Sequence, residues 1–149
     1  MNQSFYTFYP SANALRFDFA SVGRKIVSKT IIYNKTGIEN FYSLALFDVR
    51  NDGSLDDMSV TNNGDMEKIL LTVFKTFSVF FAHYPDQVVI FSGSTQSRTR
   101  LYKIAISHEL SSITDIYNVY GFKENSFELF QKNQPYTGFL VSLKSVNIA

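Results

Sequence analysis

The chain has 149 residues, a length that suits one domain with a sizeable buried core. Its composition, 45% hydrophobic and 18% charged, argues against disorder of the whole chain, and a net charge of +1 gives no global attraction for nucleic acid or an anionic membrane. Cysteine is absent, which excludes disulfides, thiolate nucleophiles and cysteine-bound zinc.

No segment of the chain carries a targeting or membrane signal. The first residues do not show a basic stretch followed by an apolar one, so no signal peptide is expected. The most apolar segment, residues 69–82, is interrupted by Lys75 and is too short to span a bilayer. We therefore expect a cytoplasmic protein that does not enter a membrane.

The first half of the chain reads as an antiparallel meander of strands. Residues 14–20 alternate apolar and polar side chains, which is the period of a half-buried strand. Further strands are predicted in residues 25–34 and 40–49. The Asp-Gly pair in residues 50–53 favours a tight turn, because glycine readily adopts the positive φ that such a turn needs.

The hydrophobic period then changes to that of a helix, predicted near residues 65–83. Asn63 or Asp65 suits its start as a cap, and Pro85 ends it. At 100° per residue, eight apolar side chains fall on one arc: Met66, Ile69, Leu70, Val73, Phe74, Phe77, Phe80 and Phe81. We expect Ile69, Val73, Phe77 and Phe80 to be core residues, with Val89 and Phe91 of the following segment under them.

The second half adds an inner strand, a second helix near residues 96–108 and three more strands. The inner strand lies in residues 87–94, where a short continuous apolar run indicates that both faces are covered. The last three strands are predicted in residues 113–122, 126–131 and 136–144, with turns at 124–125 and 133–135. This order predicts one α+β domain over residues 1–149, a mainly antiparallel sheet with two principal helices packed on it.

Two arginines near the start of the second helix have different expected environments. A helical projection places Arg98 within an apolar arc and Arg100 on the opposite arc, about 200° away. The apolar arc holds Leu101, Tyr102, Ile104, Ala105, Ile106 and His108, and the opposite arc holds Thr99, Lys103 and Ser107. A charge on the core side must be paired, so we predict that Arg98 is largely buried and bonds a carboxylate, with Asp65 as the first choice. Arg100 should be exposed.

This arginine corner has two interpretations that the residues leave open. In the first, the ion pair only fastens one helix to the other. In the second, Ser94 and Thr95 expose backbone N–H groups at the helix N-terminus, and the arginines with Tyr102 and Lys103 help to hold a phosphate or carboxylate. The segment is not a P-loop, because it lacks the second glycine and the Gly-Lys-Ser/Thr ending.

Two short motifs carry a resemblance to a known family. They are NNGD at residues 62–65 and GST-x-x-RTRLY at residues 93–102. In this order they resemble a family of short bacterial proteins of unknown function, over most of the chain. The resemblance implies no activity. It implies only positions of interest: Asn63, Gly64, Asp65, Gly93, Ser94, Thr95, Arg98, Arg100, Leu101 and Tyr102.

The residues that catalysis would need are few. His83 lies at the polar edge of the first helix, and His108 falls on the apolar face of the second, which is typical of a core histidine. No HExxH, GxSxG or GxGxxG pattern occurs, and the acidic residues 52–57 lack the ligand spacing of a calcium loop. We therefore predict a non-enzymatic protein with no cofactor and no metal site.

The remaining function classes are binding classes. We predict a protein-binding module, such as an inhibitor or antitoxin-like partner of another protein. The alternative is binding of nucleic acid or a phosphate anion through Ser94, Arg98 and Arg100, which basic residues and tyrosines favour and the neutral net charge opposes. The candidate binding residues are Asn63, Asp65, Ser94, Thr95, Arg98, Arg100, Tyr102 and Lys103. The sequence indicates no particular oligomeric state.

Overall fold

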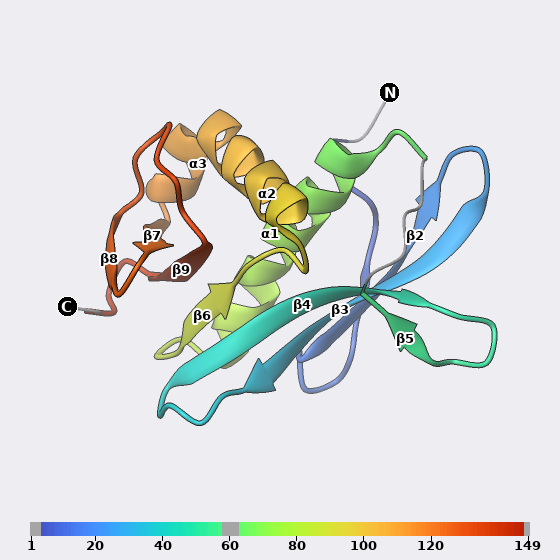
Figure 1. Cartoon of the computed structure of the whole chain (residues 1–149). Coiled ribbons are helices and arrows are strands. Elements are labelled where there is room, and N and C mark those ends of the chain that lie inside the picture. The colour runs from blue at the N-terminus through green and yellow to red at the C-terminus, as the bar shows by residue number, and fades with distance from the viewer. Residues whose placement is uncertain (1–3, 58–62, 148–149) are drawn as a thin grey trace. The chain divides into compact units, whose positions relative to one another are not determined.

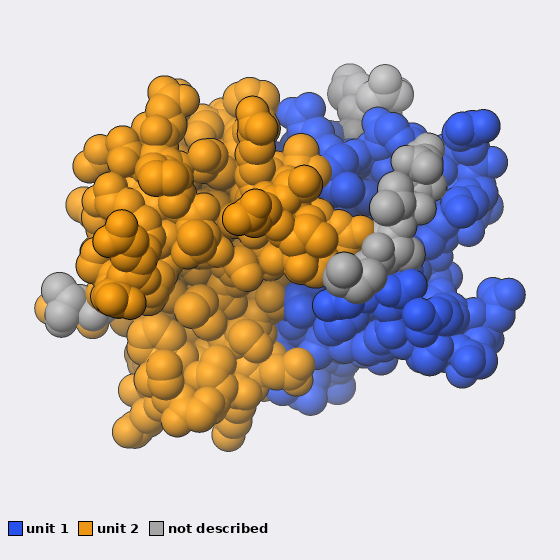
Figure 2. Space-filling view, viewed as in Figure 1, with its two compact units in different colours: residues 1–33, 45–83 blue, residues 34–44, 84–149 orange. Residues whose placement is uncertain are grey.

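The computed structural model describes residues 4–57 and 63–147 (Figure 1). The chain divides into two compact units, shown in blue and orange in Figure 2. Unit 1 contains Met1–Tyr33 and Ala45–His83, and unit 2 contains Asn34–Leu44 and Tyr84–Ala149. Two strands therefore contribute to both units, β3 (Ile26–Lys35) and β4 (Phe41–Val49).

Unit 1 combines a meander of strands with one long helix. Its other elements are β1 (Tyr9–Pro10), β2 (Arg16–Val22), β5 (Leu55–Asp56) and α1 (Met66–His83). Strands β1, β2 and β3 pair antiparallel in that order, and β5 pairs antiparallel with β4. Strand β2 alternates exposed and buried side chains along its whole length, as its sequence period predicts.

Helix α1 packs its buried face against Tyr33 of β3, which β2 contacts in turn. The ring of Tyr33 stacks on Phe80 at 4.3 Å between centroids, and its hydroxyl bonds Thr76 Oγ1 at 2.7 Å. Phe17 meets the same Tyr33 ring edge to face. The four helix residues predicted as core are confirmed by their burial: Ile69, Val73, Phe77 and Phe80. Met66, on the predicted arc, is 36% exposed because it stands at the first position of the helix.

Unit 2 holds the second half of the sheet and two helices. Its elements besides β3 and β4 are β6 (Val88–Phe91), α2 (Gln96–His108), α3 (Leu110–Thr114), β7 (Tyr117–Lys123), β8 (Ser126–Leu129) and β9 (Gly138–Leu143). The strand order is β4-β6-β9-β7-β8, in which β4 and β6 are parallel and the other pairs are antiparallel. Val89 and Phe91 of the inner strand β6 are buried, as expected.

The predicted fold class is confirmed. The sheet is mainly antiparallel, the fold is α+β, and the two principal helices match the predicted residues 65–83 and 96–108. The predicted turns are present too: Gly53 N donates to Arg50 O at 2.8 Å, and Glu124 and Asn133 adopt positive φ. Two short elements were not predicted, β1 and α3, and α3 includes residues 113–114, where a strand was predicted to begin. Strand β5 follows the turn at residues 50–53, where the sequence favours a solvated strand start. The single domain over residues 1–149 stays a prediction.

The helices of the described chain are not membrane spans. Within residues 4–57 and 63–147, no helix combines the length and the apolar character that crossing a membrane requires.

Candidate functional site

The GST-x-x-RTRLY motif forms the junction between β6 and α2. Gly93 lies so close to the first turn of the helix that a Cβ atom there would stand 2.3 Å from Thr99 N and 2.5 Å from Arg98 C. Only glycine fits such an approach of two backbone segments. The N–H of Gly93 also donates to Thr99 Oγ1 at 3.0 Å. The strand end and the helix start are thereby held together.

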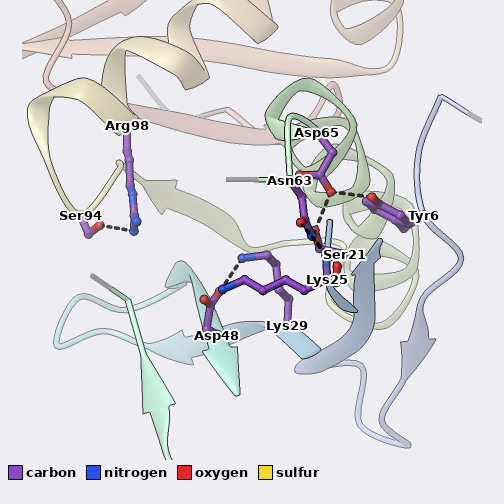
Figure 3. A network of polar contacts seen from close by, with 9 residues as sticks. All are labelled: Tyr6, Ser21, Lys25, Lys29, Asp48, Asn63, Asp65, Ser94 and Arg98. Atoms are coloured by element: carbon purple, nitrogen blue, oxygen red, sulfur yellow. Dashed lines mark hydrogen bonds and ion pairs between the residues drawn. The ribbon is translucent and has the colours of Figure 1, made fainter. Parts of the chain in front are cut away.

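The helix start is capped by the hydroxyl residues of the motif. Thr95 is the N-cap, and its Oγ1 accepts a hydrogen bond from Arg98 N at 3.2 Å. This bond satisfies one of the free N–H groups at the start of a helix. Arg98 Nη1 in turn donates to Ser94 Oγ at 2.9 Å, as Figure 3 shows. Ser94, Thr95 and Arg98 therefore support one another within unit 2.

The predicted environment of Arg98 is wrong in part. Arg98 is half-buried rather than largely buried, whereas Arg100 is exposed as predicted. The buried side of α2 consists of Thr99, Tyr102, Ala105 and Ile106. Thr99 belongs to it because its hydroxyl bonds Gly93 and Thr95, an interaction that a hydrophobic projection does not count. The buried arc is therefore centred near Tyr102. Arg98 falls within this arc but stands in the first turn of α2, where little of the unit covers its long side chain. Because the arc is centred near Tyr102, Ile104 and His108, predicted on the apolar side, are exposed.

Two further candidate residues of α2 form contacts within unit 2. Tyr102 is buried, and its ring meets Phe91 edge to face at 5.2 Å. Burial raises the pKa of the Tyr102 phenol, and the charge of Arg98 acts in the opposite direction. Lys103 Nζ donates to Gln134 O at 2.9 Å. Tyr102 and Lys103 thus stabilise the unit, and of the candidate residues on α2 it is Arg100 whose side chain is exposed.

The second motif, NNGD, lies in unit 1, and its first residue, Asn62, is outside the described residues. Asp65 Oδ2 accepts hydrogen bonds from Tyr6 Oη at 2.5 Å and from Ser21 Oγ at 2.6 Å (Figure 3). Burial raises the pKa of the Tyr6 phenol, and the Asp65 carboxylate raises it further. The pairing of Asp65 with Arg98 stays a prediction, since the two residues belong to different units.

Asn63 holds the turn between β2 and β3. Its Nδ2 donates to Lys25 O at 2.9 Å and to Ser21 Oγ at 3.0 Å, and its Oδ1 accepts from Lys25 N at 3.3 Å. A Cβ atom on Gly23 would stand 2.7 Å from Asn63 Cβ, so the turn and the motif are in close contact. We name the residues Tyr6, Ser21, Asn63 and Asp65 the hairpin clamp.

The clamp contains two residues that sequence reasoning missed. Tyr6 and Ser21 are separated from Asp65 by 59 and 44 positions, and no local period links them. A buried ion pair was missed as well. Lys29 is 5% exposed, and its Nζ bonds Asp48. Strand alternation contained the signal, because Lys29 shares a face of β3 with Ile31 and Tyr33.

The edge of unit 2 carries an apolar surface that no motif marked. Strand β8 is the last strand of the unit, and among the described residues it pairs with β7 alone. Leu129 is 62% exposed and Phe127 is 39% exposed. On the adjacent strand, Tyr120 and Phe122 contact the Phe127 ring at 5.4 and 6.1 Å between centroids. We name these four residues the β8 surface.

The chain belongs to DUF6934, a family of unknown function, whose model matches residues 2–144. This membership covers nearly all of the chain and confirms the expected resemblance to a family without an assigned activity. No curated protein and no solved structure matches the chain.

Proposed function

We propose that this protein is a protein-binding module that takes up an extended segment of a partner protein along the free edge of β8. The observation that carries the proposal is the combination of a strand edge that pairs with no other described strand and the exposed side chains of the β8 surface. An open edge offers backbone hydrogen bonds, and neighbouring side-chain positions offer selectivity, which is how strand addition works in known recognition domains.

The backbone of β8 has its free hydrogen-bonding groups at the right positions. Phe130 N donates to Val119 O at 2.9 Å, so these two residues form a bonded pair. Bonded and non-bonded pairs alternate in an antiparallel ladder, so the pairs that Leu129 forms with Tyr120 and Phe127 with Phe122 are non-bonded. The N–H and C=O groups of Phe127 and Leu129 therefore point away from β7, toward an incoming strand.

The strand itself is anchored firmly enough to act as a template. On the face of β8 opposite Phe127 and Leu129, the Tyr136 hydroxyl donates to Glu128 Oε2 at 2.7 Å. The same hydroxyl accepts from Gln131 N at 3.0 Å, just beyond the strand. Burial and the bond to Glu128 raise the pKa of Tyr136 to about 12, so the phenol stays protonated at neutral pH. A pre-ordered edge loses less conformational entropy when a partner binds.

The proposal also covers the origin of the protein, its location in the cell and the kind of binding role. We include a bacterial origin, which the two motifs support, and a cytoplasmic location, with which a composition lacking cysteine agrees. An inhibitor or antitoxin-like role is the form of protein binding that we propose for a small module without a recognisable catalytic set.

A displayed library of linear peptides, selected on the purified protein, tests the proposal. We expect enriched peptides to be extended sequences with alternating apolar side chains. Leu129→Pro should abolish their binding, because proline removes the outward N–H while leaving the bonds to β7 in place. Leu129→Thr keeps that N–H and the strand propensity and should weaken binding only moderately. Matching melting temperatures for the variants provide the control for folding.

Two results would contradict the proposal. Peptides that bind Leu129→Pro as well as the wild type would place the binding surface elsewhere. Salt-dependent retention of a short oligonucleotide, lost in Arg100→Ala and kept in Leu129→Pro, would favour the alternative of nucleic-acid binding at the N-terminal end of α2.

A further inference from the structure

The tip of the β2–β3 hairpin presents two cations beside two aliphatic side chains. Val22 and Ile26 are direct partners in the ladder and enclose the loop of Gly23, Arg24 and Lys25. Val22 is 57% exposed and Ile26 is 74% exposed. Cross-strand partners share one face of a hairpin, so these two aliphatic groups form one small apolar surface. Arg24 and Lys25 are exposed next to it.

The cations of the tip are not neutralised inside unit 1. The ion pairs of its described residues join Arg16 to Asp18, Lys29 to Asp48 and Arg50 to Asp56, and none involves Arg24 or Lys25. The nearest carboxylate of the clamp, Asp65, already accepts two hydrogen bonds. The tip therefore has positive charge available for a partner.

The hairpin clamp fixes the backbone of this tip on both strands. On the β2 side, Tyr6 Oη accepts from Val22 N at 3.1 Å and donates to Asp65. On the β3 side, Asn63 bonds both the N–H and the C=O of Lys25. Within the loop, Gly23 N donates to Lys25 O at 3.2 Å. A loop held in this way presents its side chains in one arrangement, which lowers the entropy cost of binding.

We infer that the hairpin tip is a second docking surface, independent of β8, and that its partner is an acidic segment of a protein that also carries aliphatic side chains. Charge complementarity selects the acidic segment. The exposed Val22 and Ile26 select a protein over a nucleic acid, because a phosphate backbone offers them no apolar contact. A lipid surface fits less well, since the tip has two cations and no aromatic residue, and each single basic residue adds little to binding at an anionic membrane.

In this arrangement the NNGD motif has a structural role that its sequence did not indicate. Its residues Asn63 and Asp65 do not contact the partner. They are positioning residues that fix the turn through hydrogen bonds to Ser21 and Lys25. Gly23 has no side chain, so Asn63 can approach the turn closely.

Fluorescence anisotropy with three labelled probes tests the inference. The probes are acidic–aliphatic peptides, basic peptides of matched length and a short oligothymidylate, each measured at low and at high salt. Vesicles containing phosphatidylserine are tested by sedimentation. We expect the acidic–aliphatic peptides to bind best, with affinity that falls at high salt. The double variant Arg24→Ala/Lys25→Ala should lose about tenfold in affinity or more, and Ile26→Thr should lose several-fold, in line with the modest contribution of single interface contacts.

Matched variants make the outcome decisive. Arg16→Ala removes an exposed arginine that is paired with Asp18, and Leu129→Pro removes one outward N–H of β8, so neither should change binding at the tip. Asn63→Ala should weaken binding although Asn63 does not contact the partner, because the variant loses the hydrogen bonds that fix the backbone of Lys25. Arg24→Glu/Lys25→Glu should reverse the preference to basic peptides while the clamp stays intact. Equal binding of acidic peptides to the wild type and to the reversed variant would overturn the inference, as would a preference for vesicles or oligothymidylate over all peptides.

Discussion

Gly93 has a structural role that can be isolated from any role in binding. Its backbone approaches Thr99 N and Arg98 C so closely that no side chain fits between strand and helix. We predict that Gly93→Ala lowers the free energy of unfolding by about 1–3 kcal/mol, the usual cost of overpacking. Gly37→Ala is the matched control, because a Cβ atom there meets nothing within 4 Å. Denaturant melts of both variants measure the difference, and equal stabilities would contradict the junction described here.

Replacing each of the two arginines of α2 by alanine should change stability by different amounts. The difference should be smaller than it would be if Arg98 were fully buried. Arg98 is half-buried and donates to Ser94, so Arg98→Ala should cost about 1 kcal/mol, the usual contribution of one hydrogen bond. Arg100→Ala removes an exposed side chain and should change stability by less than about 0.5 kcal/mol. Thermal melts of the two variants check this order. A loss of several kcal/mol for Arg98→Ala would contradict this estimate and favour the ion pair with Asp65 that the sequence predicts.

Single residues also show where sequence reasoning ends. Asn63 and Asp65 were recognisable because a polar motif before a helix is a local signal. Tyr6 and Ser21 were not, because their contacts with Asp65 arise only when distant segments come together. Thr99 was assigned to the solvent side because hydrophobicity scales do not register a hydroxyl that bonds a neighbouring strand.

Among the elements, α1 contributes the main apolar face of unit 1. Phe77 is 2% exposed and contacts the rings of Phe74 and Phe81. Phe77→Ala should therefore destabilise the protein by about 3–5 kcal/mol, the range for a buried aromatic side chain. Met66→Ala, in the first turn of the same helix, should cost far less because Met66 is already partly exposed. A denaturant melt in which Phe77→Ala loses less than Met66→Ala would show that the buried face is assigned wrongly.

The anchoring of β8 should depend on pH in a defined direction. The hydrogen bond that Glu128 accepts from Tyr136 holds the pKa of its carboxyl group below the ordinary value of 4.5. The ammonium group of Lys123 lowers this pKa to a smaller extent. A carboxyl group whose folded pKa is depressed contributes stability above its unfolded pKa and loses it as the pH falls through the folded value. Unfolding measured as a function of pH should therefore show a loss of stability below about 4.5 that is smaller in Tyr136→Phe. Tyr120→Phe serves as control, and an identical acid limb in Tyr136→Phe and the wild type would exclude this contribution.

The elements that could be predicted are those whose period is written within one segment. Helices α1 and α2 and strand β2 show clear 3.6- or 2-residue patterns, so the predicted helix bounds agree closely with the structure, whereas β2 covers Arg16–Val22 instead of the predicted residues 14–20. Strands β1 and β5 contain two residues each, too few to establish a period. Whether β8 lies at an edge depends on which strands pair, and pairing is decided by contacts distant in sequence.

For the molecule as a whole, the single domain predicted from length and element order implies cooperative unfolding. We expect one transition, with the same midpoint by circular dichroism and by tyrosine fluorescence. Amide exchange gives the sharper measurement, because Ile31 reports on unit 1 and Leu140 on unit 2. Equal free energies of opening at these two amides would agree with one domain. Two separate unfolding transitions would instead show that the two units are two domains.

The division into units also constrains how such a chain can arise and change. Each unit is assembled from two separate stretches of sequence, and the boundaries fall inside β3 and β4 rather than in a linker. No single cut in the gene isolates either unit, because residues 1–83 include the 34–44 excursion that belongs to unit 2. Separating the two units would require cuts inside both β3 and β4. The chain is therefore expected to be inherited, duplicated and recombined as one piece, in agreement with a family model that matches residues 2–144.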